Sequence, residues 1–409
     1  MCYTQNRFNA LLSACVMSLI ATAGWSQSLT WLGTLGDRER YAYAVSADGA
    51  VVVGMSYNAA GQYRAFRWTA SGGMQDLGAL PGGRESGAYG VSADGAVVVG
   101  WAQNAAWQLR AFRWTASGGT QDLGTLPGGR DSWAYGVSAD GAVVVGFAYD
   151  AAWQRRAFRW TAAGGMQDLG TLGGRESYAY AVSADGAVVV GWSLNAEGWI
   201  RAFRWTALGG MQALGTLGGG HSWAYGVSAN GAVVVGEAGN AAGQGRAFRW
   251  TALGGMQDLG TLPGYDRSYA YGVSADGAVV VGESGGGAFR WTASRGMENL
   301  NRTYANLLTN GSVLVRAFAI SPDGRYIVGQ GYNAATRRNE AFLLDTGPRC
   351  TAHNGDVDAN GCVDDADLLA VLFAFGQTGS NLGRVDVNCD GVVDDADLLQ
   401  VLFNFGSGC

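Results

Sequence analysis

The sequence predicts an all-β fold, a closed seven-bladed β-propeller over residues 28–347, followed by a small α-helical domain over residues 350–409. The first reason is a ten-residue stretch, VSADGAVVVG, that begins at Val45 and returns almost unchanged five more times. A divergent seventh copy, ISPDGRYIVG, begins at Ile320, and successive copies start 45 to 47 residues apart. A period of this length is typical of propeller blades. The second reason is that each period holds four short strand-like runs, as one blade does.

The chain opens with an expected secretory signal peptide over residues 1–23. Arg7 charges its start, residues 10–21 are mostly apolar, and Ala21 and Ala23 are small residues suited to cleavage. A lipoprotein signal is the alternative, because the four residues LSAC that end at Cys15 resemble a lipobox. No other stretch is long enough to span a membrane. We therefore expect a secreted or cell-surface protein that does not span a membrane.

The first blade illustrates the four runs, at residues 41–46, 50–56, 64–69 and 74–80. Asp48-Gly49 predicts a two-residue type I′ turn between the first two runs, in which both central residues need φ > 0. The valines that follow are apolar on both faces of the run, which indicates an interior strand. A two-residue turn at 71–72 would place Arg67 directly opposite Asp76, and we interpret that charge pair as structural.

The two ends of the repeat region complement each other. Residues 28–36, SLTWLGTLG, match the fourth run of a blade but have no first three runs before them. The seventh repeat has three runs, the last at residues 340–344, and lacks the fourth. The first strand can therefore complete the last blade and remove the open sheet edge. The same turn geometry predicts an apolar pair, Leu343 opposite Trp31, at this join.

Two connections of each blade vary in sequence, and in an up-and-down blade both emerge on one face, where binding residues normally lie. Aromatic residues gather there, with acidic residues between them. Flat rings beside carboxylates and arginines suit sugar rings, whereas blade packing and solvation are the alternative interpretation. The predicted ligand-binding residues are five at the start of the innermost strands, Tyr41, Trp133, Tyr178, Trp223 and Tyr269, and three in the loops between the second and third runs, Trp107, Trp153 and Trp199.

The repeats resemble the HAF-family extracellular repeat, whose Ala-Phe pair is present here in the run RAFRW. Arginine stands at the family's histidine position in five copies, at Arg64, Arg110, Arg156, Arg201 and Arg246. The resemblance covers nearly the whole repeat region. It implies an exported bacterial repeat protein and brings no established activity.

The tail holds two twelve-residue segments with the spacing of a calcium loop. Residues 356–367 read DVDANGCVDDAD and residues 386–397 read DVNCDGVVDDAD, so both have oxygen ligands at positions 1, 3 and 5, glycine at 6 and an acid at 12. Each is followed by an apolar, helix-like stretch. The duplication predicts two bound calcium ions, and a merely acidic tail is the alternative.

This tail resembles a type I dockerin, whose duplicated loop-helix units also end their loops in such an aspartate. The resemblance implies a cohesin-like or other cell-surface protein as partner. At positions 10 and 11, which help to recognise cohesin in that family, Asp365-Ala366 and Asp395-Ala396 replace the common Ser/Thr. The implied calcium ligands of loop one are Asp356, Asp358, Asn360, Asp364, Asp367 and the carbonyl of Cys362, and those of loop two are Asp386, Asn388, Asp390, Asp394, Asp397 and the carbonyl of Val392.

Four cysteines remain once the predicted signal peptide is removed, Cys350, Cys362, Cys389 and Cys409, all within the tail. An even number of cysteines in an exported segment suggests two disulfides, for which three connectivities are possible.

Composition excludes some functions. The net charge is −6, so nothing suggests a nucleic-acid partner. The chain has no lysine, which excludes a Schiff base, and its only histidines are His221 and His353. The favoured hypothesis is a non-catalytic exported scaffold that binds a glycan or surface polymer. Alternatives are a polysaccharide hydrolase or lyase and a structural envelope protein. No residue is assigned a catalytic role, because the acidic residues repeat blade by blade without a distinct cluster.

Overall fold

The computed structural model describes residues 27–36, 40–347, 353–377, 382–388 and 392–409. The predicted signal peptide lies outside the described residues. The chain divides into two compact units, Ser28–Thr346 and a C-terminal unit that holds Gly347–Cys409. No helix within the described ranges is long and apolar enough to cross a membrane.

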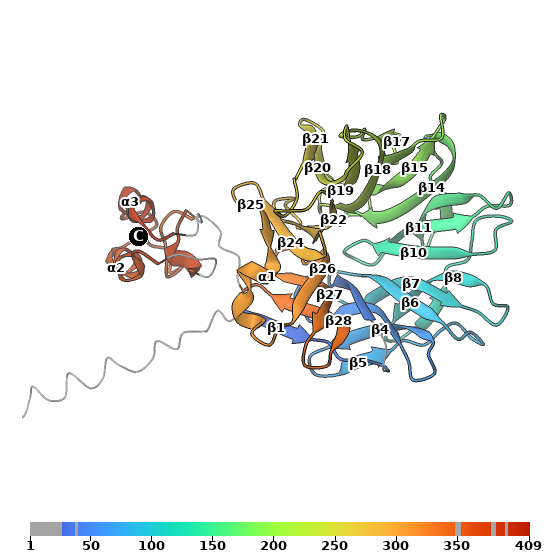
Figure 1. Ribbon diagram of the computed structural model, residues 1–409, viewed down its shortest axis with the longest axis horizontal. Coiled ribbons are helices and arrows are strands. Elements are labelled where there is room, and N and C mark those ends of the chain that lie inside the picture. The colour runs from blue at the N-terminus through green and yellow to red at the C-terminus, as the bar shows by residue number, and fades with distance from the viewer. Residues whose placement is uncertain (1–26, 37–39, 348–352, 378–381, 389–391) are drawn as a thin grey trace, which may run out of the picture. The chain divides into compact units, whose positions relative to one another are not determined.

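The first unit is a seven-bladed β-propeller of four-stranded antiparallel sheets, which Figure 1 follows from blade to blade. Blades one to three contain β2 (Arg40–Val45), β3 (Val52–Tyr57), β4 (Tyr63–Thr69), β5 (Gly73–Asp76), β6 (Ser86–Val91), β7 (Val97–Gln103), β8 (Leu109–Thr115), β9 (Gly119–Asp122), β10 (Ser132–Val137), β11 (Val143–Tyr149), β12 (Arg155–Thr161) and β13 (Gly165–Asp168).

Blades four to six contain β14 (Gly173–Val182), β15 (Val188–Asn195), β16 (Ile200–Thr206), β17 (Gly210–Ala213), β18 (Gly218–Val227), β19 (Val233–Asn240), β20 (Gly245–Thr251), β21 (Gly255–Asp258), β22 (Ser268–Val273), β23 (Val280–Ser284), β24 (Gly287–Thr292) and β25 (Gly296–Asn299). An insertion with α1 (Leu300–Thr303) and η1 (Ala305–Leu307) leads to blade seven, which contains β26 (Val313–Ile320), β27 (Tyr326–Asn333), β28 (Arg338–Asp345) and the first strand, β1 (Ser28–Trp31).

The hydrophobic core lies between neighbouring blades. In the layer between blades one and two, Val53 and Ala65 pack with Ala88, Val98 and Phe112, all at most 1% exposed. Because each sheet packs on both faces, the second strand of a blade is buried on both sides, as the valine runs predict.

The Asp-Gly turn differs from the predicted type I′ turn. A type I′ turn needs positive φ at both central residues. Gly49 has φ +72°, but Asp48 is not among the described non-glycine residues with positive φ. The N–H of Gly49 donates to the carbonyl of Ser46, and the Asp48 carboxylate accepts from the N–H of Ala50 at 3.0 Å and from the Ser46 hydroxyl at 2.6 Å. The loop is therefore longer than two residues and is held by the aspartate side chain, as in Asx-type turns.

The predicted pairing of Arg67 with Asp76 is wrong by one residue. Thr69 pairs with Gly73, so three residues form the turn, and Asp76 lies opposite Phe66. The turn has one residue more than predicted, and Gly73, which follows it, has a positive φ of +63°. Asp76 instead forms an ion pair with Arg64 at 2.9 Å.

The closure of the ring by the first strand is confirmed, with one change of register. β1 pairs antiparallel with β28 and completes the sheet order β1-β28-β27-β26. The same one-residue shift puts Phe342, not Leu343, opposite Trp31, and the two rings meet edge to face at 6.3 Å between centroids. The join is therefore apolar, although the predicted partner of Trp31 is wrong.

Backbone hydrogen bonds link neighbouring blades at the Asp-Gly turns. The N–H of Ala47 donates to the carbonyl of Ala93, and the series continues through equivalent residues until Ala275 donates to the carbonyl of Pro322. Pro322 has no N–H, so it cannot extend the series from blade seven to blade one. The apolar β1–β28 join lies in the same blade.

The C-terminal unit contains two related loop-helix segments. Their helices are α2 (Asp365–Ala374) and α3 (Asp395–Phe403), and η2 (Gly383–Val385) lies between them. The N–H of Val393 donates to the carbonyl of Gln377, and the N–H of Val363 donates to that of Ser407, so each loop binds the end of the other segment's helix. Cys362 and Cys409 form a disulfide, while Cys350 and Cys389 lie outside the described residues.

Candidate functional site

The two variable connections of a blade meet on one face of the propeller. The N–H of Arg84, in the connection from blade one to blade two, donates to Oε1 of Gln103 at 3.2 Å. Its guanidinium lies 5.3 Å from the ring centroid of Trp107, in the loop between β7 and β8. Contacts of this kind support the loops on a rigid scaffold, which is where ligand-binding side chains normally lie.

The predicted residues at the start of the innermost strands lie in a ring of cross-strand pairs, which we call the upper ring. Directly opposite residues of two antiparallel strands share one face of the sheet. The seven pairs, in blade order, are Tyr41–Met55, Gly87–Trp101, Trp133–Phe147, Tyr178–Trp192, Trp223–Glu237, Tyr269–Glu283 and Arg316–Gln330.

One part of the upper ring is aromatic. Trp133 stacks on Phe147 with 4.6 Å between centroids, Phe147 lies 4.4 Å from Tyr178 of the next blade, and Tyr178 stacks on Trp192 at 4.4 Å. Trp133 and Tyr178 are consequently half-buried, and much of each ring serves the packing between blades. We call Trp101, Trp133, Phe147, Tyr178, Trp192 and Trp223 the aromatic arc.

The other predicted upper-ring residues have different neighbours. Tyr41 stacks on Tyr43 at 5.8 Å, and Tyr269 stacks on Tyr271 at 6.2 Å. Trp223, at the end of the aromatic arc, lies 4.5 Å from His221. The five residues predicted as one set therefore occupy three surroundings.

The three predicted loop tryptophans are exposed and belong to consecutive blades. Trp107 and Trp153 are each 62% exposed and Trp199 is 55% exposed. Tyr149 links Trp153 to the aromatic arc, with centroids 6.0 Å from Trp153 and 6.1 Å from Trp133. Blades two to four thus carry aromatic rings from the innermost strands to the loop tips. We call the loop tryptophans, Tyr149 and the aromatic arc together the aromatic sector.

Trp107 and Trp153 adopt a backbone conformation that disfavours large side chains. Their φ values are +61° and +59°, and glycine fills the same loop position in blades one, four and five, at Gly61, Gly198 and Gly243. A bulky residue at positive φ is uncommon and is strained. The loop is nevertheless fixed, because Oδ1 of Asn104 accepts the N–H groups of Ala106 and Gln108 at 3.0 Å each. Exposed indoles held in strained positions are a candidate binding surface.

The opposite part of the upper ring is polar, which the sequence analysis missed. Arg316 forms an ion pair with Glu283 at 2.7 Å. Glu237 is only 8% exposed, and its carboxyl group has no hydrogen-bond partner among the described residues. Burial raises the pKa of the Glu237 carboxyl to about 7, against a smaller lowering effect of Arg267. The signal was present, because VVVGE occurs in repeats five and six only, where other repeats have Met, Trp, Phe or Gln after the glycine.

A second ring of aromatic residues lies next to the upper ring. Neighbouring centroids are 4.9 to 5.6 Å apart around the circle of Tyr43, Tyr89, Tyr135, Tyr180, Tyr225, Tyr271 and Phe318. Burial raises the pKa of Tyr180, whose hydroxyl accepts from Nε1 of Trp192 at 3.2 Å. The seven residues are half-buried and line a hollow of ≈ 300 Å³ rather than a closed core. Burial keeps their phenols protonated, so the ring offers no nucleophile.

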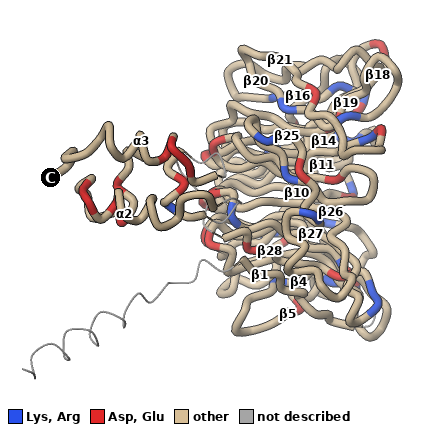
Figure 2. Tube along the Cα trace, turned by 60° about the vertical axis from the view of Figure 1, so that its left-hand side comes forward, with Lys and Arg blue, Asp and Glu red and all other residues tan. Residues whose placement is uncertain are grey.

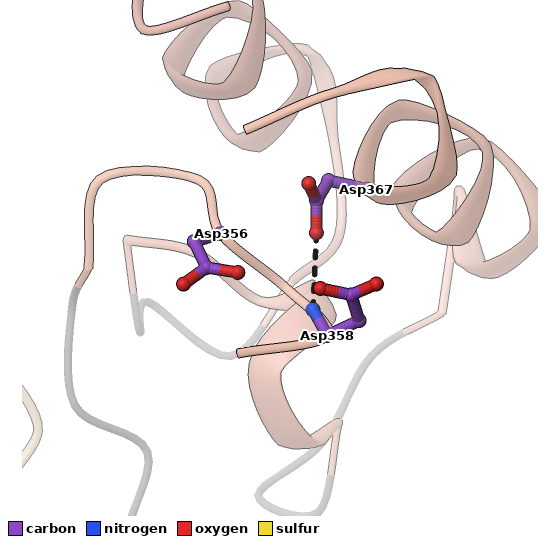
Figure 3. Close-up of side chains that lie close together, drawn as sticks. All are labelled: Asp356, Asp358 and Asp367. Carbon is purple, nitrogen blue, oxygen red and sulfur yellow. Dashed lines mark hydrogen bonds between the residues drawn. The ribbon is translucent and has the colours of Figure 1, made fainter. Parts of the chain in front are cut away.

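In the C-terminal unit, three predicted calcium ligands of loop one lie together (Figure 3). Asp356, Asp358 and Asp367 each offer a carboxylate oxygen, all within 4.8 Å of one another. Oδ1 of Asp367 accepts the N–H groups of Val357 at 2.6 Å and Asp358 at 3.0 Å. The fit to calcium is chemical, since calcium prefers six to eight oxygen ligands and a carboxylate can accept further partners.

Two of the predicted ligands also have a structural role that the sequence analysis did not anticipate. Asp364 is the N-cap of α2 and accepts the N–H of Ala366 at 2.8 Å. Asp367 completes a capping box, because its Oδ2 accepts the N–H of Asp364 at 2.9 Å. Asn360 accepts the N–H of Cys362 through Oδ1 at 2.7 Å. The spacing of an N-cap and an acid at N3 is also that of positions 9 and 12 of the loop.

Loop two repeats these contacts as far as it is described. Asp394 caps α3, and Asp397 accepts the N–H groups of Asn388 and Asp394 at 3.0 Å each. Of the other predicted ligands of loop two, Asp386 is buried. Asp390 lies outside the described residues, and Val392 is the first described residue after it. In Figure 2 the red segments beside α2 and α3 mark these acidic loops.

Both helices of the C-terminal unit also expose large apolar side chains. Phe373 and Phe403 are more than four-fifths exposed, at equivalent places on α2 and α3. Leu369, Leu372, Leu399 and Leu402 are about half exposed beside them. Exposed apolar surface of this kind is typical of protein-binding sites.

No family model matches the chain, and no curated protein matches it in sequence. Solved structures are similar to it. An oligogalacturonate lyase in complex with manganese is 11% identical with a TM-score of 0.51, over 78% of this chain and 92% of that one. The β-propeller domain of Myceliophteria thermophila Cps50 (Swd1) is 11% identical with a TM-score of 0.48, over 78% and 99%. TolB from Acinetobacter baumannii is 12% identical with a TM-score of 0.43, over 76% of this chain and 65% of TolB. At these identities the likeness is one of fold.

Proposed function

We propose that this protein is an exported, non-catalytic binding or scaffold protein whose aromatic sector holds a glycan or surface polymer. The observation that carries the proposal is the pair of exposed tryptophans, Trp107 and Trp153, at positions where other blades have glycine. Retaining a strained indole has a free-energy cost, and such strain typically accompanies functional sites. The gain that offsets it is a ligand contact.

The chemistry of the aromatic sector suits a carbohydrate. Pyranose rings present apolar C–H faces that stack on indole and phenol rings, while their hydroxyls need polar partners. Arg84 lies over Trp107, and Arg155 lies 5.8 Å from the Tyr149 ring centroid and 3.6 Å from the Glu176 carboxylate. Aromatic rings that run from the innermost strands to the loop tips would contact several units of a polymer.

The proposal includes a calcium-dependent, dockerin-like role for the C-terminal unit. Loop one would hold one ion through Asp356, Asp358, Asn360, Asp364, Asp367 and the Cys362 carbonyl, and loop two a second through its equivalents. Bound calcium would neutralise acidic loops that contain ten aspartates against one basic residue, Arg384, over residues 351–409. The apolar surfaces of α2 and α3 would then contact a cohesin-like or other cell-surface protein.

The glycan proposal is tested by affinity electrophoresis of the protein in gels that contain each member of a panel of bacterial and plant polysaccharides. The double variant Trp107→Gly/Trp153→Gly should lose the retardation that the unaltered protein shows. The matched control is Leu208→Ala/Leu253→Ala, because these leucines are also large exposed apolar residues but lie at the turns between third and fourth strands. Retardation that survives the tryptophan changes would reject the proposal, and absence of retardation on every polymer would favour a structural envelope role.

A polysaccharide hydrolase or lyase is the second candidate, and the polar part of the upper ring favours it. Glu237 has a pKa of about 7, whereas Glu283 is paired with Arg316. Two carboxyls in different environments suit acid and base roles. Release of reducing ends or unsaturated products, abolished in Glu237→Gln and kept in Trp107→Gly, would support an enzyme. No release by the unaltered protein would exclude this candidate for the polymers tested.

A further inference from the structure

Blade six departs from the other blades at several positions, and those positions line one hollow. We call this hollow the notch. It has a volume of ≈ 350 Å³ and lies at the variable-loop ends of β23, β24 and β25 and at the start of β26. Volumes near this value are at the lower end of small-molecule sites.

A shortened loop opens the notch. In blade one seven residues separate Ser56 from its partner Arg64, whereas in blade six only Gly285 and Gly286 separate Ser284 from its partner Gly287. The five missing residues would otherwise cover this end of the blade.

A tyrosine occupies part of the vacated space. Tyr265 stands where Gly83 and Gly129 stand in the connections that lead into blades two and three. A Cβ at Gly83 would collide with the carbonyl of Gln103, the last residue of β7, from which the long loop of the next blade starts. With that loop shortened, Tyr265 fits over Gly285 and remains 52% exposed at the edge of the notch.

An ion pair found in other blades is also missing here. Arg64 and Asp76 pair at 2.9 Å in blade one, and equivalent pairs occur in blades two and three. Blade six has Gly287 and Asn299 at these places. Gly287 and Asn299 both line the notch, and glycine leaves out the side chain that arginine contributes in blades one to three.

The insertion between blades six and seven forms the remaining wall. Asn301 fixes it, since its side chain accepts the N–H of Leu314 at 2.7 Å and donates to the carbonyl of Leu314 at 2.8 Å. Leu308 and Val313 supply apolar surface. Oδ1 of Asn299 accepts the N–H of Asn301, but its Nδ2 has no hydrogen-bond partner among the described residues.

We propose that the notch binds one uncharged, hydroxyl-bearing unit of the size of a single neutral sugar. No charged side chain lines it, so a charged ligand would lose its hydration without compensation. The Tyr265 ring and Leu308 provide an apolar surface for one face of the ligand, and the Asn299 amide provides a hydrogen-bond donor. This site is separate from the aromatic sector, and the inference does not rest on the proposed function.

The experiment is a calorimetric and saturation-transfer NMR titration of the full-length protein with methyl glucoside, methyl galactoside and methyl mannoside, and with glucuronate and glucosamine as charged probes. At least one neutral glycoside should bind, and the charged probes should not. The double variant Gly287→Arg/Asn299→Asp restores the ion pair of blades one to three and fills the notch. It should weaken binding by about tenfold or more, because it removes a donor and occupies the site.

The chain supplies its own controls. Position 287 accepts a side chain, since the nearest atom to a Cβ there would be Cδ1 of Leu262 at 3.4 Å, and aspartate is as good an N-cap for α1 as asparagine. The thermal midpoint of the variant should therefore equal that of the unaltered protein. Leu208→Ala/Leu253→Ala, at exposed turns of blades four and five, should leave glycoside binding unchanged. Preference for a charged probe, absence of binding by all neutral glycosides, or full binding by the filled variant would overturn the proposal.

Discussion

Single residues account for the main departures from repeat symmetry. Trp107 and Trp153 occupy a glycine position, and Glu237 occupies a place that is aromatic in blades two to four. Each change is unfavourable in isolation, because positive φ costs free energy for a bulky residue and burial costs free energy for a carboxyl group without a partner. In a chain whose blades are near copies, such residues mark where selection acts on more than packing.

The first prediction concerns strain at the loop tips. Trp107→Gly or Trp153→Gly should leave the free energy of unfolding unchanged or raise it by up to about 1 kcal/mol. Left-handed backbone costs residues other than glycine roughly 1–2 kcal/mol. Glycine avoids this cost, but it loses more conformational entropy on folding, which offsets part of the gain. Gly61→Trp should lower the free energy of unfolding by a similar amount. Denaturant unfolding measures both. A loss above about 2 kcal/mol in the glycine variants would show that the indoles stabilise the fold by packing.

The second prediction concerns Glu237. Its folded pKa of about 7 lies above the ordinary value of 4.5, so the folded state binds the proton more tightly than the unfolded state does. The stabilisation is complete below about pH 4.5 and is lost as pH rises through about 7. The thermal midpoint of the unaltered protein should therefore fall between pH 5 and 8 more than that of Glu237→Gln.

The control for this pH dependence is Glu197→Gln, because Glu197 is exposed at a loop tip. It should follow the unaltered protein at every pH. Arg267, Tyr225 and Tyr271 interact electrostatically with Glu237, and burial raises the pKa of both tyrosines, so these phenols stay protonated over this range. Parallel curves for Glu237→Gln and the unaltered protein would contradict the raised pKa.

At the scale of elements, short turns decide the register and one motif has two roles. The three-residue turn at 70–72 shifts Asp76 from Arg67 to Phe66, and the same shift moves Trp31 from Leu343 to Phe342. In the C-terminal unit the D-x-x-D sequence at 364–367 is both a capping box and the end of a calcium-loop pattern. Helix capping therefore fixes Asp367 beside Asp356 and Asp358 before any ion binds.

The third prediction follows from this arrangement. The full-length protein should bind two calcium ions in a calorimetric titration, and Asp358→Ala should bind one, because the substitution removes a ligand at position 3 of loop one. Asp365→Ala is the matched control, since this aspartate is exposed at position 10 and should leave two ions bound. Equal stoichiometry for all three proteins, or no binding heat, would contradict the predicted calcium loops.

At the scale of the whole molecule, stability depends on closure of the ring. β1 supplies the outer strand of blade seven, and Trp31 and Leu29 pack on the cluster that contains Phe342, Leu344 and Tyr304. The inter-blade hydrogen bonds cannot continue from Pro322 to blade one. Side chains hold this junction, where Val45 and Val52 of blade one pack with Val328, Ala341 and Leu343 of blade seven.

The fourth prediction tests that closure. Removal of residues 28–36 should lower the thermal midpoint sharply and produce oligomers, because β28 then has an open, apolar edge that pairs with other chains. Light scattering after size exclusion measures the oligomers. A synthetic peptide of residues 28–36, added in trans, should restore the monomer and part of the midpoint, and a truncated chain that stays monomeric with an unchanged midpoint would show that β1 is dispensable.

The blade count, the four strands of each blade and the closure by β1 could be predicted from the sequence, because a 45-residue period and a missing fourth run are properties of the chain. The sequence did not determine register, since side chains alternate with a period of two and one extra turn residue exchanges their partners. The exposed tryptophans could also be named from the sequence, but the positive φ of Trp107 and Trp153 could not be predicted from it. The repeat period places Glu237, Glu283 and Arg316 at equivalent positions of one ring, but the burial of Glu237, the Arg316–Glu283 ion pair and the notch follow from how side chains of neighbouring blades pack, which the period does not specify.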